Sequence, residues 1–132
     1  MIKYMLDTNI VIYTIKNMPE KVRQAFKLHT DQMCISSVTL MELVYGAEKS
    51  AKPEENLRVI EGFIARLEVM DFDHIAAFHS GQIRAELSRS GKPIGPYDNL
   101  IAAHARSRGL ILVTNNEKEF NRVQGLRTTN WA

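Results

Sequence analysis

The sequence has little of what small proteins use as staples or as membrane anchors. Its 132 residues contain one cysteine, Cys34, so no disulfide can form within the chain. Cys34 lies in the apolar segment MCIS, where a small buried side chain is the simplest interpretation. Lys3, Asp7 and Lys16 interrupt the apolar N-terminus, so neither a membrane span nor a signal peptide is predicted. We therefore expect a cytoplasmic protein that does not contact membranes.

An excess of charge of one sign is also missing. Seventeen Lys and Arg residues face fifteen Asp and Glu residues, which gives a formal net charge of +2. A pI near 8.8 permits a nucleic-acid partner, but it falls short of the strongly basic character that predicts one. The sequence has no low-complexity tract and no internal repeat. With 45% hydrophobic residues, we expect one globular domain over residues 1–132.

Short apolar runs alternate with amphipathic segments along the chain. Most of the runs are nearly continuously apolar, which indicates a mainly parallel sheet with helices on both faces, an α/β fold. The runs IKYML, MCISS, EVMDF, LILVT and RTTNW predict strands, and the last is expected at an edge of the sheet. Helices are predicted over residues 8–16, 19–29, 38–48, 53–67, 73–91 and 96–109, with a short one after residue 116.

Local signals predict how these helices begin. Thr8 is expected to cap the first helix, and the serines after MCI to cap the third. Asn116 and Glu119 have the spacing of a capping box for the last short helix. In a parallel sheet, ligands gather beyond the carboxyl ends of the strands. Asp7, Ser36 to Ser37 and Thr114 to Asn116 lie at such ends.

Three acidic residues have no local partner to neutralise them. Asp7 ends the first strand, Glu42 lies in the third helix without a helical ion pair, and Asp98 lies in the first turn of a later helix. If the parallel sheet forms, these carboxylates converge at one of its ends, where they cannot all stay ionised without a cation or a proton. Oxygen ligands favour Mg²⁺ or Mn²⁺ over zinc.

Each acid also has an ordinary structural interpretation. Asp98 can offset the helix dipole, Glu42 can be a solvated helix residue, and Asp7 can cap the helix that follows it. Asn116, taken alone, is best explained as a helix cap. Other sites have weaker support, because the histidines lack HxxxH spacing and no GxSxG, P-loop or GxGxxG motif is present.

Four segments together resemble one known family. They are MLDTN after the first strand, SSVTLMELVYGA around Glu42, PYDNLIAAHA around Asp98, and TNNEKEFNRVQGLRTTNW at the C-terminal end. In this order and spacing they are similar to the PIN-domain ribonucleases, specifically the VapC toxins of VapBC toxin–antitoxin systems. The resemblance covers essentially the whole chain and implies a three-layer α/β/α sandwich.

The resemblance also implies a site. In it, Asp7, Glu42 and Asp98 form an acidic pocket that holds one or two Mg²⁺ or Mn²⁺ ions. A fourth position, often Asp in the family, falls here on Asn116, which lowers the negative charge of the site. Glu119 is the alternative residue for this place.

The resemblance further implies partners. A VapB-type antitoxin is expected to cover a groove among the helices at residues 8–16, 38–49 and 53–67, and the toxin is expected to form homodimers or toxin–antitoxin hetero-oligomers. The implied substrate is RNA, with the anticodon stem-loop of initiator tRNA as the first candidate. Its cleavage would inhibit translation and growth until the antitoxin binds.

These inferences predict metal-assisted hydrolysis of RNA. Asp7 and Asp98 are expected to ligate the metal, and Glu42 to hold or orient the attacking water. Asn116 is expected to position that water or the scissile phosphate. Further candidates for positioning the substrate are Thr8, Asn9, Thr114, Lys92 and Glu119, with Arg84, Arg89 and Lys118 as less specific RNA contacts.

Two other classes of function remain open from the sequence. A phospho-acceptor receiver domain has a similar length and also uses strand-end acids with Mg²⁺. However, Asp7 lies between Leu6 and Thr8, so the acidic pair expected after the first strand is missing. The other alternative is a non-catalytic binding module that keeps the acids for stability.

Overall fold

A five-stranded parallel sheet forms the centre of the molecule. The computed structural model describes residues 1–17 and 19–132. The strand order is β3-β2-β1-β4-β5, and the four pairings between neighbouring strands are parallel. The predicted α/β class with a mainly parallel sheet is confirmed, and the last strand lies at an edge as expected. The strands are β1 (Tyr4–Leu6), β2 (Met33–Ser36), β3 (Glu68–Met70), β4 (Ile111–Val113) and β5 (Arg127–Thr129).

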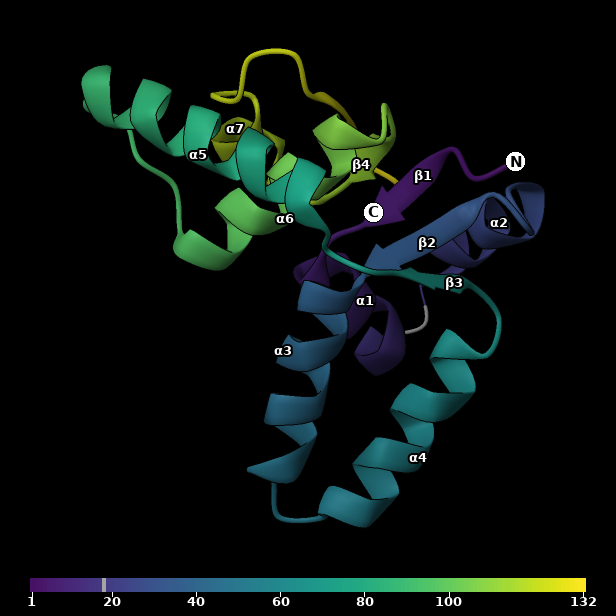
Figure 1. The fold of residues 1–132 in the computed structure, drawn as a ribbon. Helices are drawn as coiled ribbons and strands as arrows, with labels where there is room; N and C mark the ends of the chain where they lie inside the picture. The colour runs from purple at the N-terminus through teal and green to yellow at the C-terminus, as the bar shows by residue number, and fades with distance from the viewer. Residues whose placement is uncertain (18) are drawn as a thin grey trace.

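Helices cover both faces of this sheet, so the molecule has three layers (Figure 1). On one face, α3 and α4 pack against each other as a helical hairpin that extends away from the sheet. On the other face, α5 packs along α6. The first face carries α1 (Thr8–Asn17), α2 (Glu20–Leu28), α3 (Ser37–Glu48) and α4 (Pro53–Ile64), and the second carries α5 (His74–Arg89), α6 (Pro96–Ser107) and α7 (Glu117–Phe120).

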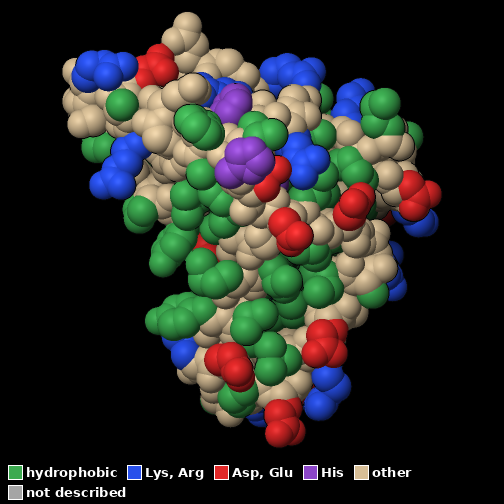
Figure 2. Space-filling view, viewed as in Figure 1, with side chains coloured by type: hydrophobic (Ala, Val, Ile, Leu, Met, Phe, Trp, Pro, Cys, Tyr) green, Lys and Arg blue, Asp and Glu red, His purple; other side chains and the backbone are tan. Residues whose placement is uncertain are grey.

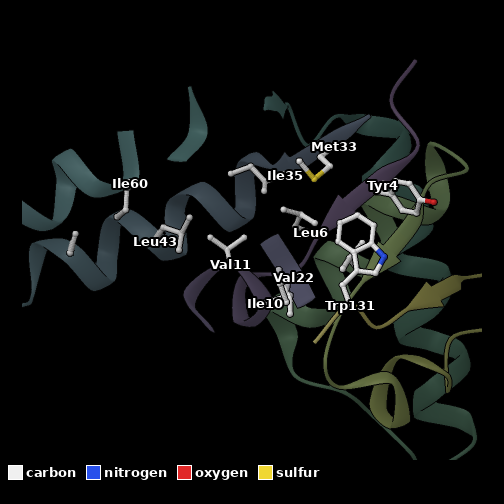
Figure 3. Packing of buried hydrophobic residues seen from close by; sticks show 12 residues of the cluster. Tyr4, Leu6, Ile10, Val11, Val22, Met33, Ile35, Leu43, Ile60 and Trp131 are labelled. Atoms are coloured by element: carbon white, nitrogen blue, oxygen red, sulfur yellow. The ribbon is translucent and has the colours of Figure 1, made fainter. Parts of the chain in front are cut away.

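The alternation of side chains along each strand gives the sheet two separate cores. Tyr4 and Leu6 belong to the cluster under α1 to α4, whereas Met5 between them belongs to the cluster under α5 to α7. Cys34 and Leu112 join Met5 on that second face. Figure 3 shows the first cluster, in which side chains of β1, β2 and α1 interlock. Burial on both faces explains why the inner strands β1 and β4 are apolar throughout, whereas the edge strands β3 and β5 begin with the exposed charged residues Glu68 and Arg127.

Cys34 is a buried free cysteine, as predicted. Burial raises the pKa of its thiol to about 12, so the reactive thiolate is suppressed at neutral pH. Of the helices that the structure describes, none combines the length and the hydropathy that a membrane crossing requires.

Two predicted helix caps are wrong. Asp7, and not Thr8, caps α1, because the backbone N–H of Ile10 donates to Asp7 Oδ1 at 2.7 Å. The capping box at α7 does not form either. Asn116 makes no side-chain cap bond, because its amide instead donates to the carboxylate of Glu119 at 3.0 Å. The predicted cap of α3 is confirmed, since Ser36 Oγ accepts from the N–H of Val38.

The order of the strands reverses beside β1. From β1 the chain passes through α1 and α2 to β2 on one side, whereas β4 pairs with β1 on the other side. In open parallel sheets, such a reversal forms a crevice at the carboxyl ends of the strands on either side of it, because the helices that follow them leave toward opposite faces. Asp7 follows β1 and Thr114 follows β4, so both lie at this crevice.

Candidate active site

Asp7 is held at the crevice by hydrogen bonds to both of its carboxylate oxygens. Its side chain is only 1% exposed. The hydroxyl of Thr114 donates to Oδ2 at 2.6 Å, and the N–H of Ile10 donates to Oδ1 at 2.7 Å. These bonds join the ends of β1 and β4 to the start of α1. The carboxylate is therefore positioned before any ligand arrives.

Burial raises the pKa of Asp7 above its ordinary value of 3.8. The hydrogen bonds from Thr114 and Ile10 oppose this rise, whereas the negative charge of Glu42 adds to it. Ionised Asp7 is thus unfavourable where it stands, and a nearby cation would remove much of that cost.

Glu42 is oriented by a threonine of α1. Thr8 Oγ1 donates to Glu42 Oε1 at 2.6 Å, and the hydroxyls of Thr8 and Thr39 are hydrogen-bonded at 3.2 Å. Thr8 and Thr39 are both buried. This contact ties α1 to α3 and keeps Glu42 at the crevice.

Asp98 and Glu119 form a second acidic pair. Burial, the hydrogen bond to Glu119, and the charges of Glu119, Asp7 and Glu42 raise the pKa of Asp98 to about 7. Burial opposes ionisation of Glu119 as well, but hydrogen bonds from Asp98, from the N–H of Gly95 and from Asn116 lower its pKa overall. The pKa of Asp98 therefore lies above that of Glu119, and a proton bound by the pair favours Asp98, whose carboxyl donates a hydrogen bond to Glu119.

Asn116 supports this pair and does not replace a carboxylate. Its backbone N–H donates to Thr114 Oγ1 at 2.9 Å, and its side-chain amide donates to Glu119. Gly95 N–H donates to the other oxygen of Glu119 at 3.3 Å. The sequence left Asn116 and Glu119 as alternatives for the fourth position. In the structure, the carboxylate beside Asp98 is that of Glu119.

The donor set fits a hard divalent cation in its chemistry. Asp7, Glu42, Asp98 and Glu119 supply carboxylate oxygens, the ligands that Mg²⁺ and Mn²⁺ prefer. Burial is the main cause of the raised pKa values of Asp7 and Asp98, and the charges of the neighbouring acids add to both. Among residues 1–17 and 19–132, however, no three His, Cys, Asp or Glu side chains stand as a ready-made metal-binding group. Binding of a cation thus requires these side chains to shift and Asp98 to release its proton.

The residues predicted to position the substrate fall into two groups. Thr8 and Thr114 are buried, and their hydroxyls bind carboxylates of the site. Asn9 and Lys92 are exposed, and their side chains have no hydrogen-bond partner in the described part of the chain. Contact of any of these residues with a substrate stays a prediction.

Thr39 is a site residue that the sequence analysis missed. It lies three residues before Glu42 in α3, so the helical spacing places both on one face. That spacing is the sequence signal from which the role of Thr39 could have been predicted. His104, in contrast, serves the core: it is buried, its Nδ1 lies 2.8 Å from Ser36 Oγ, and burial lowers its pKa.

Comparison with known proteins identifies the family. The model of the PIN domain matches residues 4–126. The chain is 66% identical to the tRNA(fMet)-specific endonuclease VapC of Shigella flexneri and 57% identical to the ribonuclease VapC2 of Haemophilus influenzae, in both cases over 100% of each chain.

Solved structures agree with this result. The DNA-bound VapBC complex of Salmonella typhimurium contains a chain with 64% identity and a TM-score of 0.98, and the alignment covers 100% of both chains. The DNA-bound VapBC2 of Rickettsia felis gives 41% identity and a TM-score of 0.95, and the alignment covers 99% of this chain and 100% of that one. Ribonucleases of the PIN-domain family are generally metal-dependent. Because the family model matches most of the chain and these relatives match all of it, the chain belongs to the PIN-domain family and, within it, to the VapC ribonucleases.

Proposed function

We propose that this protein is a metal-dependent endoribonuclease that cleaves a tRNA, with initiator tRNA(fMet) as its first candidate substrate. The observation that carries the proposal is the buried carboxylate of Asp7, fixed on both oxygens at the crevice and subject to the charge of Glu42. The substrate is inferred from two full-length relatives, at 66% and 64% identity, that are named tRNA(fMet)-specific endonucleases.

Asp7 and Asp98 would hold the ion, which we infer to be Mg²⁺, with Mn²⁺ as the alternative. When bound, such an ion lowers the pKa of the attacking water and offsets negative charge on the phosphate. Asp98 can take part only in its ionised form, so the proton that it shares with Glu119 must leave first. Asn116 then keeps Glu119 in place as the fourth acidic side chain.

Glu42 would orient the attacking water. Its Oε1 accepts from the hydroxyl of Thr8, whereas Oε2 makes no hydrogen bond among the described residues, so we assign the hydrogen bond from the water to Oε2. Because water is the nucleophile in this scheme, the products carry a 5′-phosphate and a 3′-hydroxyl.

The proposed partner is a VapB-type antitoxin. Large apolar side chains are exposed on the α3–α4 hairpin, and Figure 2 shows hydrophobic side chains spread over this part of the molecule. Covering them would remove apolar surface from water. The exposed residues are Met41, Val44 and Tyr45 of α3 and Val59 of α4. We further propose that the protein assembles as a homodimer or as a toxin–antitoxin hetero-oligomer.

A toxin that cleaves tRNA would act in the cytoplasm and would inhibit translation and growth until its antitoxin binds. Co-expression with the neighbouring antitoxin gene should restore growth. Unaltered RNA cleavage in a stable complex of the two proteins would contradict silencing by occlusion of the site.

The decisive experiment is to incubate purified protein with total RNA and Mg²⁺ and to sequence the new 5′ ends. We expect a single cluster of ends in the anticodon stem-loop of tRNA(fMet), absent with the Asp7→Asn variant. Cleavage that persists in excess EDTA would refute the role of the metal. A 2′,3′-cyclic phosphate at the cut would show that the 2′-hydroxyl of the RNA, and not water, is the nucleophile.

A further inference from the structure

A surface pocket of about 610 Å³ lies between α5, the loop at residues 91–95 and the start of α6. Ser80, Arg84 and Ser88 line it from α5. Ile94 lines it from the loop, and Asn99 from α6. The pocket thus combines a cation, hydroxyl groups and an amide with an apolar wall.

Arg84 offers an unpaired positive charge to this pocket. Ser80, Arg84 and Ser88 are four residues apart in α5 and so lie on one face of the helix. Within the part of the chain that the structure describes, Arg84 has no carboxylate within salt-bridge distance, and its guanidinium makes no hydrogen bond. Its fork of N–H groups is therefore available to a phosphate.

Asn99 offers a hydrogen-bond donor from a buried position. The side chain is only 7% exposed, and its Oδ1 accepts from the hydroxyl of Ser80 at 2.7 Å. Its Nδ2 has no hydrogen-bond partner among the described residues. Among the described residues, the fully buried side-chain nitrogen or oxygen that lacks a partner is Nε2 of His104. Because Asn99 Nδ2 also lacks a partner but is not such an atom, it is accessible from the surface. The amide of Asn99 is thus fixed by Ser80 with its donor open to the pocket.

The pocket lies next to the acidic cluster along α6. Asp98 immediately precedes Asn99, but it contacts Glu119, whereas Asn99 and Pro96 line the pocket. The loop between the two sites is held by Glu119, which accepts from Gly95 N–H. The first turn of α6 therefore lies between the acidic cluster and the pocket. An RNA strand cleaved at the acidic cluster can extend into the pocket.

We propose that this pocket binds one nucleotide of single-stranded RNA that flanks the scissile phosphate, an inference that rests on the proposed ribonuclease function. Arg84 pairs with the phosphate of that nucleotide, and Asn99 Nδ2 donates to an oxygen on the edge of its base. Ile94 and Leu100 contact the face of the base. A base can enter such a pocket only when it is unstacked, which favours a loop over a duplex.

The charge at this end of the molecule favours RNA over a protein partner. Arg89 and Lys92 are exposed near the pocket and form no ion pair within the described chain. In Figure 2, Lys and Arg side chains stand out at the upper left, where α5 ends and the loop begins. The exposed apolar residues Met41 and Tyr45, which suit a protein partner, lie instead on α3.

The test measures RNA binding separately from cleavage. In the Asp7→Asn background, a synthetic anticodon stem-loop is titrated against Arg84→Ala, Arg84→Lys and the charge-matched control Arg58→Ala on α4. We expect Arg84→Ala to weaken binding about tenfold and to lower the slope of log K against log salt by about 0.7. Arg84→Lys should restore the salt slope, and Arg58→Ala should change neither quantity. Equal losses for Arg84→Ala and Arg58→Ala would reveal non-specific attraction and overturn the subsite.

Crosslinking gives a second measurement that does not depend on a substitution in the pocket. 4-Thiouridine placed on either side of the cut site should crosslink to the peptide that contains Ile94 and Asn99. Crosslinks to other peptides would refute the proposal. It would also be refuted if Arg84→Ala weakened antitoxin binding or dimerisation but left RNA binding unchanged. Failure of the wild-type protein to cleave RNA would refute the proposed function, whereas normal RNA binding by Arg84→Ala would refute only the subsite.

Discussion

At the scale of single residues, the site is defined by carboxylates whose ionisation is opposed by their surroundings. Asp7 is buried and lies near the charge of Glu42, and Asp98 is partly buried and hydrogen-bonded to Glu119. The hydrogen bonds around these groups keep them in place without neutralising them. Buried acids of this kind lower the stability of the fold without a ligand. They are typical of sites whose stability increases when a cation binds.

Replacing Asp7 should separate activity from stability. We expect Asp7→Asn to lower the cleavage rate about 100-fold or more, because a ligand of the metal is lost. The free energy of unfolding should rise by up to about 1 kcal/mol in EDTA, because a buried charge is removed while the amide oxygen can still accept from Ile10. Cleavage assays and urea denaturation measure the two effects. A variant that is both inactive and strongly destabilised would show that Asp7 acts mainly as a helix cap.

Asp98 should make the stability of the metal-free protein depend on pH. Burial and the contact with Glu119 raise the pKa of Asp98 from 3.8 to about 7 in the folded state. Between these values the folded state keeps a proton that the unfolded chain releases, so the free energy of unfolding falls as the pH rises through this window. After screening at a partly exposed group, the loss is on the order of 1 kcal/mol.

The Asp98→Asn variant should flatten this dependence, leaving the smaller slope that Asp7 contributes in the same direction. Urea denaturation in EDTA at about pH 5 and about pH 8 gives the comparison. Glu61→Gln, an exposed substitution on α4, is the control and should keep the wild-type slope. An unchanged slope in Asp98→Asn would mean that Asp98 is ionised throughout this range.

At the scale of secondary-structure elements, the site depends on how α1 and α3 leave the sheet. The two helices follow inner strands of the sheet, α1 after β1 and α3 after β2. Their first turns are joined by the hydroxyls of Thr8 and Thr39, and Thr8 orients Glu42 from the neighbouring helix. The position of Glu42 is thus a property of helix packing and not of α3 alone.

Removing the hydroxyl of Thr8 should release Glu42. Thr8→Val keeps the shape of the side chain but removes the donor, so we expect kcat to fall about tenfold and the free energy of unfolding to fall by about 1 kcal/mol. Thr8→Ser is the matched control, because it keeps the donor and should retain most of the activity. Wild-type kcat in Thr8→Val would refute the positioning role of Thr8.

At the scale of the whole molecule, the parallel sheet brings together acids from four segments of the chain. Asp7, Glu42, Asp98 and Glu119 follow or lie within elements on both faces of the sheet. A cation shared by these four acids would therefore stabilise the tertiary structure as a whole, because it would join several helices and strands. Membership of the PIN-domain family also excludes the receiver-like alternative left open by the sequence.

Mg²⁺ should accordingly raise the melting temperature of the wild-type protein. At a Mg²⁺ concentration of about 100 times the dissociation constant, the gain is about 2.7 kcal/mol. The double variant with Asp7→Asn and Asp98→Asn should show no such shift, and scanning calorimetry with and without EDTA measures both. A shift of equal size in the two proteins would place the ion elsewhere. Stabilisation without any RNA cleavage would support the non-catalytic binding module instead.

The fold was largely predictable because its signals are local. Apolar runs of strand length, Pro96 at the start of α6 and the glycines after α5 and α6 set most element positions within a few residues. The two wrong caps failed for different reasons. Thr8 donates its hydroxyl to Glu42 in α3, far along the chain, which is a tertiary contact. Asn116 donates its amide to Glu119, three residues on in α7, so a local contact replaces the cap.

The sequence by itself determined the class of this protein: a parallel α/β sheet, three acids without local partners, and the family that their spacing resembles. It does so because propensity and hydrophobic period act over a few residues at a time. Only the tertiary structure decided that Glu119 stands beside Asp98, that Thr39 supports Glu42 through Thr8, and that Arg84 and Asn99 share a pocket. These pairings join residues far apart in the chain, and their distances are set by how helices pack on the sheet, which no local pattern encodes.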